Sequence, residues 1–128
     1  MHKIETKCIH GEESDCLTKS YGAVAVPIYQ TAMFSHPGIG QNQGYDYSRE
    51  SNPTRSYLED IIKTLEGAVD TVACSSGMSA ISICLSLFDP GDHIICGDDL
   101  YGGSVRMFNF YNHFGLEFSY VNTADTNA

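Results

Sequence analysis

Basic residues are scarce in this 128-residue sequence. Seven Lys and Arg stand against sixteen Asp and Glu, which gives a formal net charge of -9 at pH 7. Phosphodiester backbones and anionic lipid surfaces repel a chain with this balance. We therefore expect neither nucleic acid nor a membrane as a partner.

Long apolar runs are also missing. No uninterrupted hydrophobic stretch approaches the length of a membrane-spanning helix, and the first residues, Met1 to Glu5, lack the apolar core of a secretory signal. We therefore expect a cytoplasmic protein. With 42% hydrophobic and 18% charged residues, the chain has the composition of a globular protein and the length of one modest domain.

The cysteines form no C-x-x-C pair and no regular spacing, which argues against a disulfide framework and against a zinc site. Cys74, Cys84 and Cys96 lie in apolar segments, where a reduced cysteine behaves as a small buried hydrophobe. No two histidines have metal-ligand spacing, and the pair Asp98 and Asp99 has no further ligand nearby. We expect no metal site.

The character of the sequence changes near residue 50. Up to that point the chain is irregular, with polar stretches, a short apolar run at 23–28 and a glycine-rich piece at 37–44. Such a segment usually needs another surface to lie on. We predict that residues 1–50 form an extended arm that contacts a neighbouring subunit, and that residues 51–128 form part of an α/β domain.

Regular patterns begin after residue 50. Asn52-Pro53 is typical of a helix start, apolar residues recur at helical spacing up to Leu65, and Gly67 ends the helix. The predicted elements that follow alternate between strand and helix, with strands over 69–74, 93–96 and 116–121 and helices over 78–88 and 104–114. This order predicts a mainly parallel sheet with flanking helices, in which ligands bind at the carboxyl ends of the strands.

The turn Ser75-Ser76-Gly77-Met78-Ser79 lies between the first predicted strand and its helix. Backbone N–H groups at a helix N-terminus converge on one point, the helix dipole favours negative charge there, and Gly77 allows a ligand to approach closely. The pattern suits a phosphate-sized anion, and it equally suits an ordinary capped turn. Neither G-x-x-x-x-G-K nor G-x-G-x-x-G is present, which disfavours nucleotide binding.

A second candidate site is Tyr45-Asp46-Tyr47-Ser48-Arg49, at the end of the arm. An arginine can bind two phosphate oxygens while a nearby tyrosine hydroxyl donates to a third, and this combination suits a phosphate monoester. From the residues alone, a surface arginine beside packing tyrosines is the simpler interpretation.

The third candidate is the loop after the second predicted strand, Asp98 to Gly103. Tyr101 could stack on a flat cofactor, with the glycines leaving room behind the ring, and its hydroxyl could take part in proton transfer. A loop with an exposed tyrosine is the alternative.

Taken together, six segments resemble the Cys/Met-metabolism family of pyridoxal-phosphate enzymes. This family includes cystathionine synthases and lyases, methionine γ-lyase and the acyl-homoserine sulfhydrylases. The segments occur in the family's order and spacing along nearly the whole chain. They are GAVAVPIYQT (22–31), YDYSR (45–49), NPTR (52–55), SSGM (75–78), PGDH (90–93) and DLYGG (99–103).

The resemblance implies a fold type I domain, like that of aspartate aminotransferase, with pyridoxal 5'-phosphate as its cofactor. It implies that the backbone at Gly77 and Met78 holds the cofactor phosphate. By the same resemblance, Tyr47 and Arg49 reach that phosphate from the neighbouring subunit. Tyr101 is the implied catalytic residue, because it would lie over the pyridine ring and assist proton transfer or leaving-group departure.

Family members are much longer, and the resemblance places their Schiff-base lysine beyond Ala128. None of Lys3, Lys7, Lys19 and Lys63 matches its position. We therefore expect an amino-terminal portion that is inactive alone.

The resemblance implies that the full-length protein is a homo-oligomer, either a dimer or a tetramer of dimers. The implied reactions are β- or γ-elimination or γ-replacement on cysteine, cystathionine, methionine or O-acyl-homoserine type substrates. The alternative hypothesis is a non-catalytic truncated product that binds phosphate compounds weakly or associates with full-length subunits.

Overall fold

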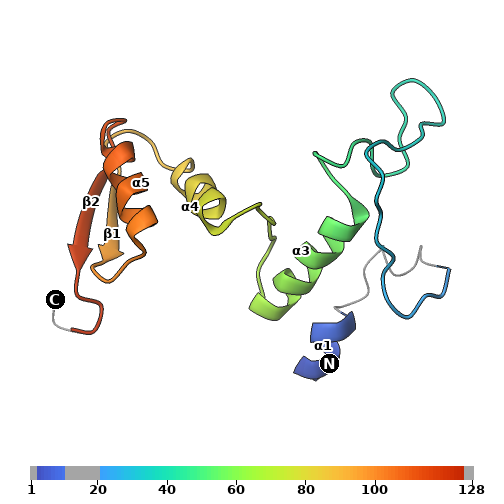
Figure 1. Ribbon diagram of the computed structural model, residues 1–128, viewed down its shortest axis with the longest axis horizontal. Helices are drawn as coiled ribbons and strands as arrows, with labels where there is room; N and C mark the ends of the chain where they lie inside the picture. The colour runs from blue at the N-terminus through green and yellow to red at the C-terminus, as the bar shows by residue number, and fades with distance from the viewer. Residues whose placement is uncertain (1–2, 11–20, 126–128) are drawn as a thin grey trace. The chain divides into compact units, whose positions relative to one another are not determined.

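The computed structural model describes residues 3–10 and 21–125 (Figure 1). Contacts divide the chain into a first unit, Met1–Ala73, and a second unit, Cys74–Ala128. The elements follow in the order α1 (Ile4–His10), α3 (Pro53–Glu66), α4 (Gly77–Leu85), β1 (His93–Gly97), α5 (Gly102–Asn112) and β2 (Glu117–Val121).

In the first unit, α3 begins and ends where the sequence predicts. The Asn52 side chain accepts a hydrogen bond from the backbone N–H of Thr54 at 2.9 Å, and Pro53 occupies the first turn. At the other end, Gly67 adopts a left-handed φ of 62° and donates its N–H to the carbonyl of Lys63. The predicted start and stop of this helix are confirmed.

The short helix α1 lies against α3 in the same unit. The Tyr57 hydroxyl donates a hydrogen bond to the carbonyl of Ile9, at 3.1 Å. The sequence pattern predicts no helix here, because so short a segment carries little periodicity.

Residues 21–51 run without a helix or a regular strand. Two backbone bonds pair the ends of the glycine-rich loop, from Phe34 N–H to the Asp46 carbonyl and from Ser48 N–H to the Ala32 carbonyl, both at 2.9 Å. This irregular course fits the predicted arm, of which residues 11–20 lie outside the described part. Its contact with a neighbouring subunit stays a prediction.

In the second unit, β1 and β2 pair in parallel, with Ile95 opposite Ser119. Helix α5 connects the strands and packs against β2 (Figure 1). The Phe108 ring of α5 stacks on Phe118 of β2, with ring centroids 4.7 Å apart. Among the described residues of this unit, the buried ones are Leu85, Ser104, Phe108 and Leu116. The predicted parallel pairing and its crossover helix are confirmed.

Backbone hydrogen bonds join the turn that precedes β1 to the turn that precedes β2. Gly91 donates its N–H to the Gly115 carbonyl at 2.7 Å, and Glu117 donates its N–H to the Asp92 carbonyl at 2.9 Å. Gly115 has a φ of +92°, and a Cβ at this position would stand 3.0 Å from Cβ of Pro90. Only glycine therefore fits here without strain, and the two strands start level with each other.

The predicted strand over 69–74 is wrong. Among the described residues the sheet has two strands, and no strand forms in this segment. The N–H of Thr71 donates to the Asp70 carboxylate at 2.9 Å, and the N–H of Ala73 donates to the Glu59 carboxylate at 2.8 Å. These two amides therefore bind side-chain carboxylates and not the backbone of a neighbouring strand.

The predicted helix over 78–88 stops early, at Leu85. The next N–H groups bond three residues back, from Leu87 to Cys84 at 3.2 Å and from Phe88 to Leu85 at 3.3 Å. Such bonds tighten the chain into a turn that ends the helix. Helix α5 in turn begins at Gly102, before the predicted start at 104.

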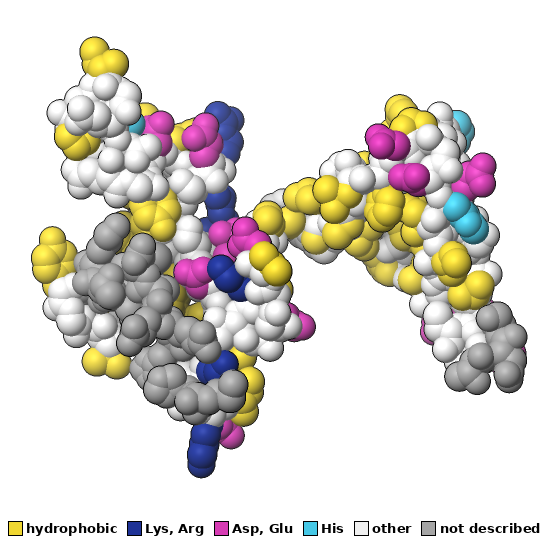
Figure 2. All heavy atoms as spheres, turned by 180° about the vertical axis from the view of Figure 1, so that it is seen from behind, with side chains coloured by type: hydrophobic (Ala, Val, Ile, Leu, Met, Phe, Trp, Pro, Cys, Tyr) yellow, Lys and Arg dark blue, Asp and Glu magenta, His cyan; other side chains and the backbone are white. Residues whose placement is uncertain are grey.

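The predicted burial of the cysteines is wrong for Cys84, which is exposed, whereas Cys74 and Cys96 are half-buried. Helix α4 packs on α5 along one face, so its remaining faces lie open within the described residues. Burial raises the pKa of the Cys96 thiol. Figure 2 shows apolar side chains at the surface of both units.

Candidate functional site

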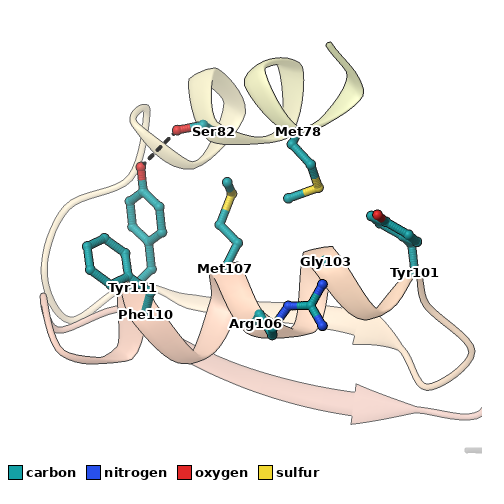
Figure 3. A pocket seen from close by; sticks show the side chains of 8 residues that line it. All are labelled: Met78, Ser82, Tyr101, Gly103, Arg106, Met107, Phe110 and Tyr111. Carbon is teal, nitrogen blue, oxygen red and sulfur yellow. Dashed lines mark hydrogen bonds between the residues drawn. The ribbon is translucent and has the colours of Figure 1, made fainter.

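A cavity of about 470 Å³ lies between α4 and α5 in the second unit (Figure 3). The first turns of α4 form one wall of the cavity, and one face of α5 forms the other. Its lining residues are Met78, Ser82, Tyr101, Gly103, Arg106, Met107, Phe110 and Tyr111.

The first turn of α4 is the segment in which the sequence predicts an anion site. Ser76 caps the helix, and its hydroxyl accepts the N–H of Ser79 at 3.1 Å. No described residue accepts a hydrogen bond from the N–H of Gly77 or Met78. These two amides are therefore available to an anion at the positive end of the helix dipole.

Hydroxyl groups and open space surround these amides. The Ser79 hydroxyl lies 2.9 Å from that of Ser76 and 3.3 Å from that of Ser75. Apart from the adjoining residues and the helix backbone, a Cβ placed on Gly77 would meet no atom within 4 Å. A ligand therefore has open space in which to approach the helix start beside Gly77.

Tyr101 lies at the mouth of the same cavity. It directly precedes α5, and its side chain is 71% exposed. Figure 3 shows its ring and the Met78 side chain bordering the same part of the cavity. The structure thus places Met78 and Tyr101 at one cavity within one unit. This arrangement is what a cofactor would need if its phosphate bound at Met78 and its ring stacked on Tyr101.

Arg106 also lines the cavity, and the sequence analysis missed it. No described carboxylate pairs with its guanidinium, which can therefore bind a carboxylate of a ligand. Helical spacing could have found it, because Arg106 lies one turn beyond Gly103 on the same face of α5.

At the end of the cavity away from Tyr101, the hydroxyls of Ser82 and Tyr111 form a hydrogen bond of 3.2 Å. Figure 3 shows this bond joining α4 to α5. It links the two helices that line the cavity.

Tyr47 and Arg49 lie together in the first unit. The guanidinium carbon of Arg49 stands 5.0 Å from the centroid of the half-buried Tyr47 ring, in a cation–π contact. Within the described residues no carboxylate neutralises this guanidinium. The arm therefore presents a tyrosine and an exposed arginine as one group, in a different unit from Met78 and Tyr101.

The described residues contain neither a cluster of metal ligands nor a membrane-spanning helix. In residues 3–10 and 21–125, no three His, Cys, Asp or Glu side chains gather closely enough to hold a metal ion. Over the same residues, no helix has the length and apolar character needed to cross a membrane.

The model of the family described as Cys/Met metabolism PLP-dependent enzyme matches residues 5–128. This chain belongs to that family. The predicted resemblance is confirmed, and the six quoted segments all fall within the matched range.

Named relatives agree with this membership. A cystathionine beta-lyase from Lactococcus lactis subsp. cremoris (strain MG1363) is 51% identical over 109 residues, which make up 85% of this chain and 28% of the relative. A cystathionine gamma-lyase from Bacillus subtilis (strain 168) is 43% identical over 123 residues, or 95% of this chain and 32% of the relative. The chain spans about a third of the length of such relatives.

A solved structure supports the fold. The crystal structure of cystathionine gamma-lyase from Lactobacillus plantarum, complexed with L-serine, is 47% identical and gives a TM-score of 0.85. The match covers 99% of this chain and 33% of that protein. The predicted fold class, part of a fold type I domain with a parallel sheet, is confirmed.

Pyridoxal phosphate, the cofactor of this family, fits the residues present. Its phosphate needs N–H donors, and Gly77 and Met78 offer two amides that bind no described acceptor. Its ring needs a flat partner, and the exposed Tyr101 side chain borders the cavity that Met78 also lines. The open space at Gly77 leaves room for the group to approach.

Proposed function

We propose that this chain is the amino-terminal part of a pyridoxal-phosphate enzyme of transsulfuration. The reaction is β- or γ-elimination or γ-replacement on cysteine, cystathionine, methionine or O-acyl-homoserine type substrates. The observation that carries the proposal is the cavity between α4 and α5, which Met78 and Tyr101 line together. The names of the relatives, cystathionine lyases and synthases, support this reaction class.

The phosphate of the cofactor is held from two sides in this proposal. Gly77 and Met78 donate their backbone N–H groups from the start of α4. Tyr47 and Arg49 reach the same phosphate from the neighbouring subunit of a cytoplasmic homo-oligomer. Support comes from the exposure of Arg49 and from its pairing with a tyrosine in the arm.

When bound, pyridoxal phosphate supplies an electron sink for the substrate's α-carbon. Tyr101 has two roles in this proposal. Its ring stacks on the flat cofactor. Its hydroxyl lies at the mouth of the cavity and donates a proton to the leaving group of the substrate. Arg106 binds a carboxylate of the amino-acid substrate from α5.

The test of the phosphate role is Arg49→Ala in the complete polypeptide that contains these residues. We expect the affinity for pyridoxal phosphate to fall by about tenfold or more, because a charge-assisted hydrogen bond contributes roughly 1.5–3 kcal/mol. Equilibrium dialysis of the cofactor-free protein measures it. Lys63→Ala is the control, since it removes a cation of α3 outside the quoted segments, and its affinity should be unchanged. Unchanged affinity in Arg49→Ala would refute the role.

The lysine that binds the cofactor covalently lies outside residues 1–128 in this proposal. The relatives are about three times as long as the chain, and Lys63 lies on α3 in the first unit. Borohydride reduction of the loaded complete polypeptide, followed by peptide mass spectrometry, locates the labelled lysine. A label on Lys63 or on an arm lysine would contradict this assignment, and a complete polypeptide that takes no label would favour the non-catalytic alternative.

A further inference from the structure

The two glycines that open α5 stand in different surroundings. A Cβ built on Gly103 would lie 2.4 Å from Cε1 of Tyr101, 3.0 Å from its Cδ1 and 3.2 Å from its Cζ. Apart from its neighbours in the chain, Tyr101 and Gly103, a Cβ built on Gly102 would meet nothing within 4 Å. The Tyr101 ring therefore lies against the α-carbon of Gly103, and a side chain at this position would require the ring to move.

Backbone conformation does not explain a glycine at position 103. Its φ is not among the positive values of the described glycines, and it lies in the first turn of a helix. In a helix, alanine is favoured over glycine. The contact with the Tyr101 ring is thus the reason that the structure offers for this residue.

Little else restrains the Tyr101 side chain. Its residue caps α5 without a side-chain hydrogen bond, and no described residue binds its hydroxyl. The outer side of the ring is open, since the side chain is 71% exposed. The surface of Gly103 is therefore the inner support that defines where the ring lies at the mouth of the cavity.

We propose that Gly103 is a positioning residue, whose missing side chain seats the Tyr101 ring against α5 so that the phenol faces the cavity. This inference rests on the proposed function for the role of Tyr101. The seating itself is a property of the chain alone.

The test compares Gly103→Ala with Gly102→Ala in the complete polypeptide. In Gly103→Ala the new methyl group displaces the ring. We expect kcat to fall by about a hundredfold, as a misplacement of about 1 Å can produce, with a small change in KM. The dissociation constant for pyridoxal phosphate should rise roughly two- to tenfold, in line with the loss of one aromatic stacking contact.

Gly102→Ala is the matched control, because it adds the same methyl group one residue earlier, where no atom beyond the two adjoining residues lies within 4 Å. Its kcat and its cofactor affinity should stay within twofold of the parent protein. Equal losses in both variants would overturn the proposal, since they would point to a general effect of alanine on this turn.

A second background shows whether Gly103 acts through the ring. When Tyr101→Ala is already present, adding Gly103→Ala should change the cofactor affinity by less than twofold. An undiminished loss in that background would overturn the proposal. Crystal structures of the cofactor-free parent and Gly103→Ala proteins give a readout independent of binding, and a ring that keeps its place in the variant would likewise overturn it.

These outcomes separate the inference from the function on which it rests. If the parent protein binds no pyridoxal phosphate, the proposed function fails. The displacement of the Tyr101 ring in the cofactor-free crystal structure still decides the seating by Gly103.

Discussion

The arm at residues 21–51 and the β1–α5–β2 region contrast in what holds them. In the arm, polar contacts fix the chain: His36 bonds the Asp46 carboxylate at 2.7 Å, and the Ser48 hydroxyl bonds the Thr31 carbonyl. No side chain described in residues 21–51 is buried. The β1–α5–β2 region instead packs Phe108 on Phe118 above a regular parallel ladder. Hydrogen bonds at the surface therefore determine the course of the arm, whereas the burial of apolar side chains stabilises the β1–α5–β2 region.

This difference suits the tasks proposed for the two regions. Hydrogen bonds can set the course of an exposed chain, but in water each contributes only about 1 kcal/mol net. Such a segment keeps its polar groups, among them Arg49, available to another surface. Burial makes a firmer platform, and Tyr101 stands at its edge. We therefore expect the two regions to respond to different perturbations.

Removing the central aromatic contact should have the largest effect. Phe108→Ala empties the stacking position on Phe118 and should destabilise the second unit by about 3–5 kcal/mol. Hydrogen exchange of the β1 and β2 amides in the complete polypeptide measures this, and the exchange of the arm amides should be unaffected.

Phe110→Ala is the control, because this phenylalanine of the same helix is 59% exposed while Phe108 is 8% exposed. Its effect should stay within about 1 kcal/mol. Similar losses in both variants would mean that burial does not distinguish the second unit.

An intermediate effect should come from Asn52, which ties α3 to the arm. Its amide nitrogen donates to the Tyr29 carbonyl at 3.2 Å and to the Ser48 hydroxyl at 2.8 Å, while its oxygen caps α3. Asn52→Ala removes both functions and should destabilise the first unit by about 1–2 kcal/mol.

Asn52→Asp separates these functions, because the carboxylate keeps the cap and loses both donated bonds. Amides of α3 should then exchange at nearly the parent rate, while the Ser48 amide exchanges faster. Faster exchange throughout α3 in Asn52→Asp would show that the helix cap depends on the hydrogen bonds to Tyr29 and Ser48.

The smallest effect should come from pH, through His36 in the arm. The hydrogen bond to Asp46, followed by that to the Gln41 carbonyl, raises the pKa of His36 above its ordinary value of 6.5. Since the folded pKa is the higher one, the stabilisation is fully present below about pH 6.5 and is lost as the pH rises through the folded value. NMR titration of the His36 ring, with exchange of the Phe34 amide, measures it.

Asp46→Asn is the control for this titration. It removes the charged partner, so the pKa of His36 should move back toward its ordinary value and the Phe34 amide should lose its pH dependence. An unchanged titration in that variant would exclude Asp46 as the cause.

The features that local residues determine could be predicted from the sequence. Helix α3 carries both of its ends in its own residues, Asn52-Pro53 and Gly67, and the structure has the same bounds. The turn at Ser76 and Gly77 likewise caps α4, although α4 begins one residue earlier than predicted. The alternation of helix and strand predicted the parallel pair, because a short crossover helix leaves few other topologies.

Features that depend on a distant partner could not be predicted. The segment 69–74 has strand-forming residues, but a strand requires a neighbour, and two of its amides bind carboxylates instead. Cys84 lies in an apolar run, yet its exposure depends on which face of α4 meets α5. Helical spacing places Arg106 on the same face of α5 as Gly103, but only the packing of α4 on α5 shows that this face borders a cavity.

The hydrogen-bonded turns at Gly91 and Gly115 affect which parts of this unit can vary. They set the register of β1 and β2 at one end, so the opposite loops can change in length or chemistry without slipping the strands. Tyr101 follows one of those loops. A change in the loop that precedes Tyr101 can therefore leave the paired strands in place, and relatives that match 85% or more of this chain are named as β-lyases, γ-lyases and γ-synthases.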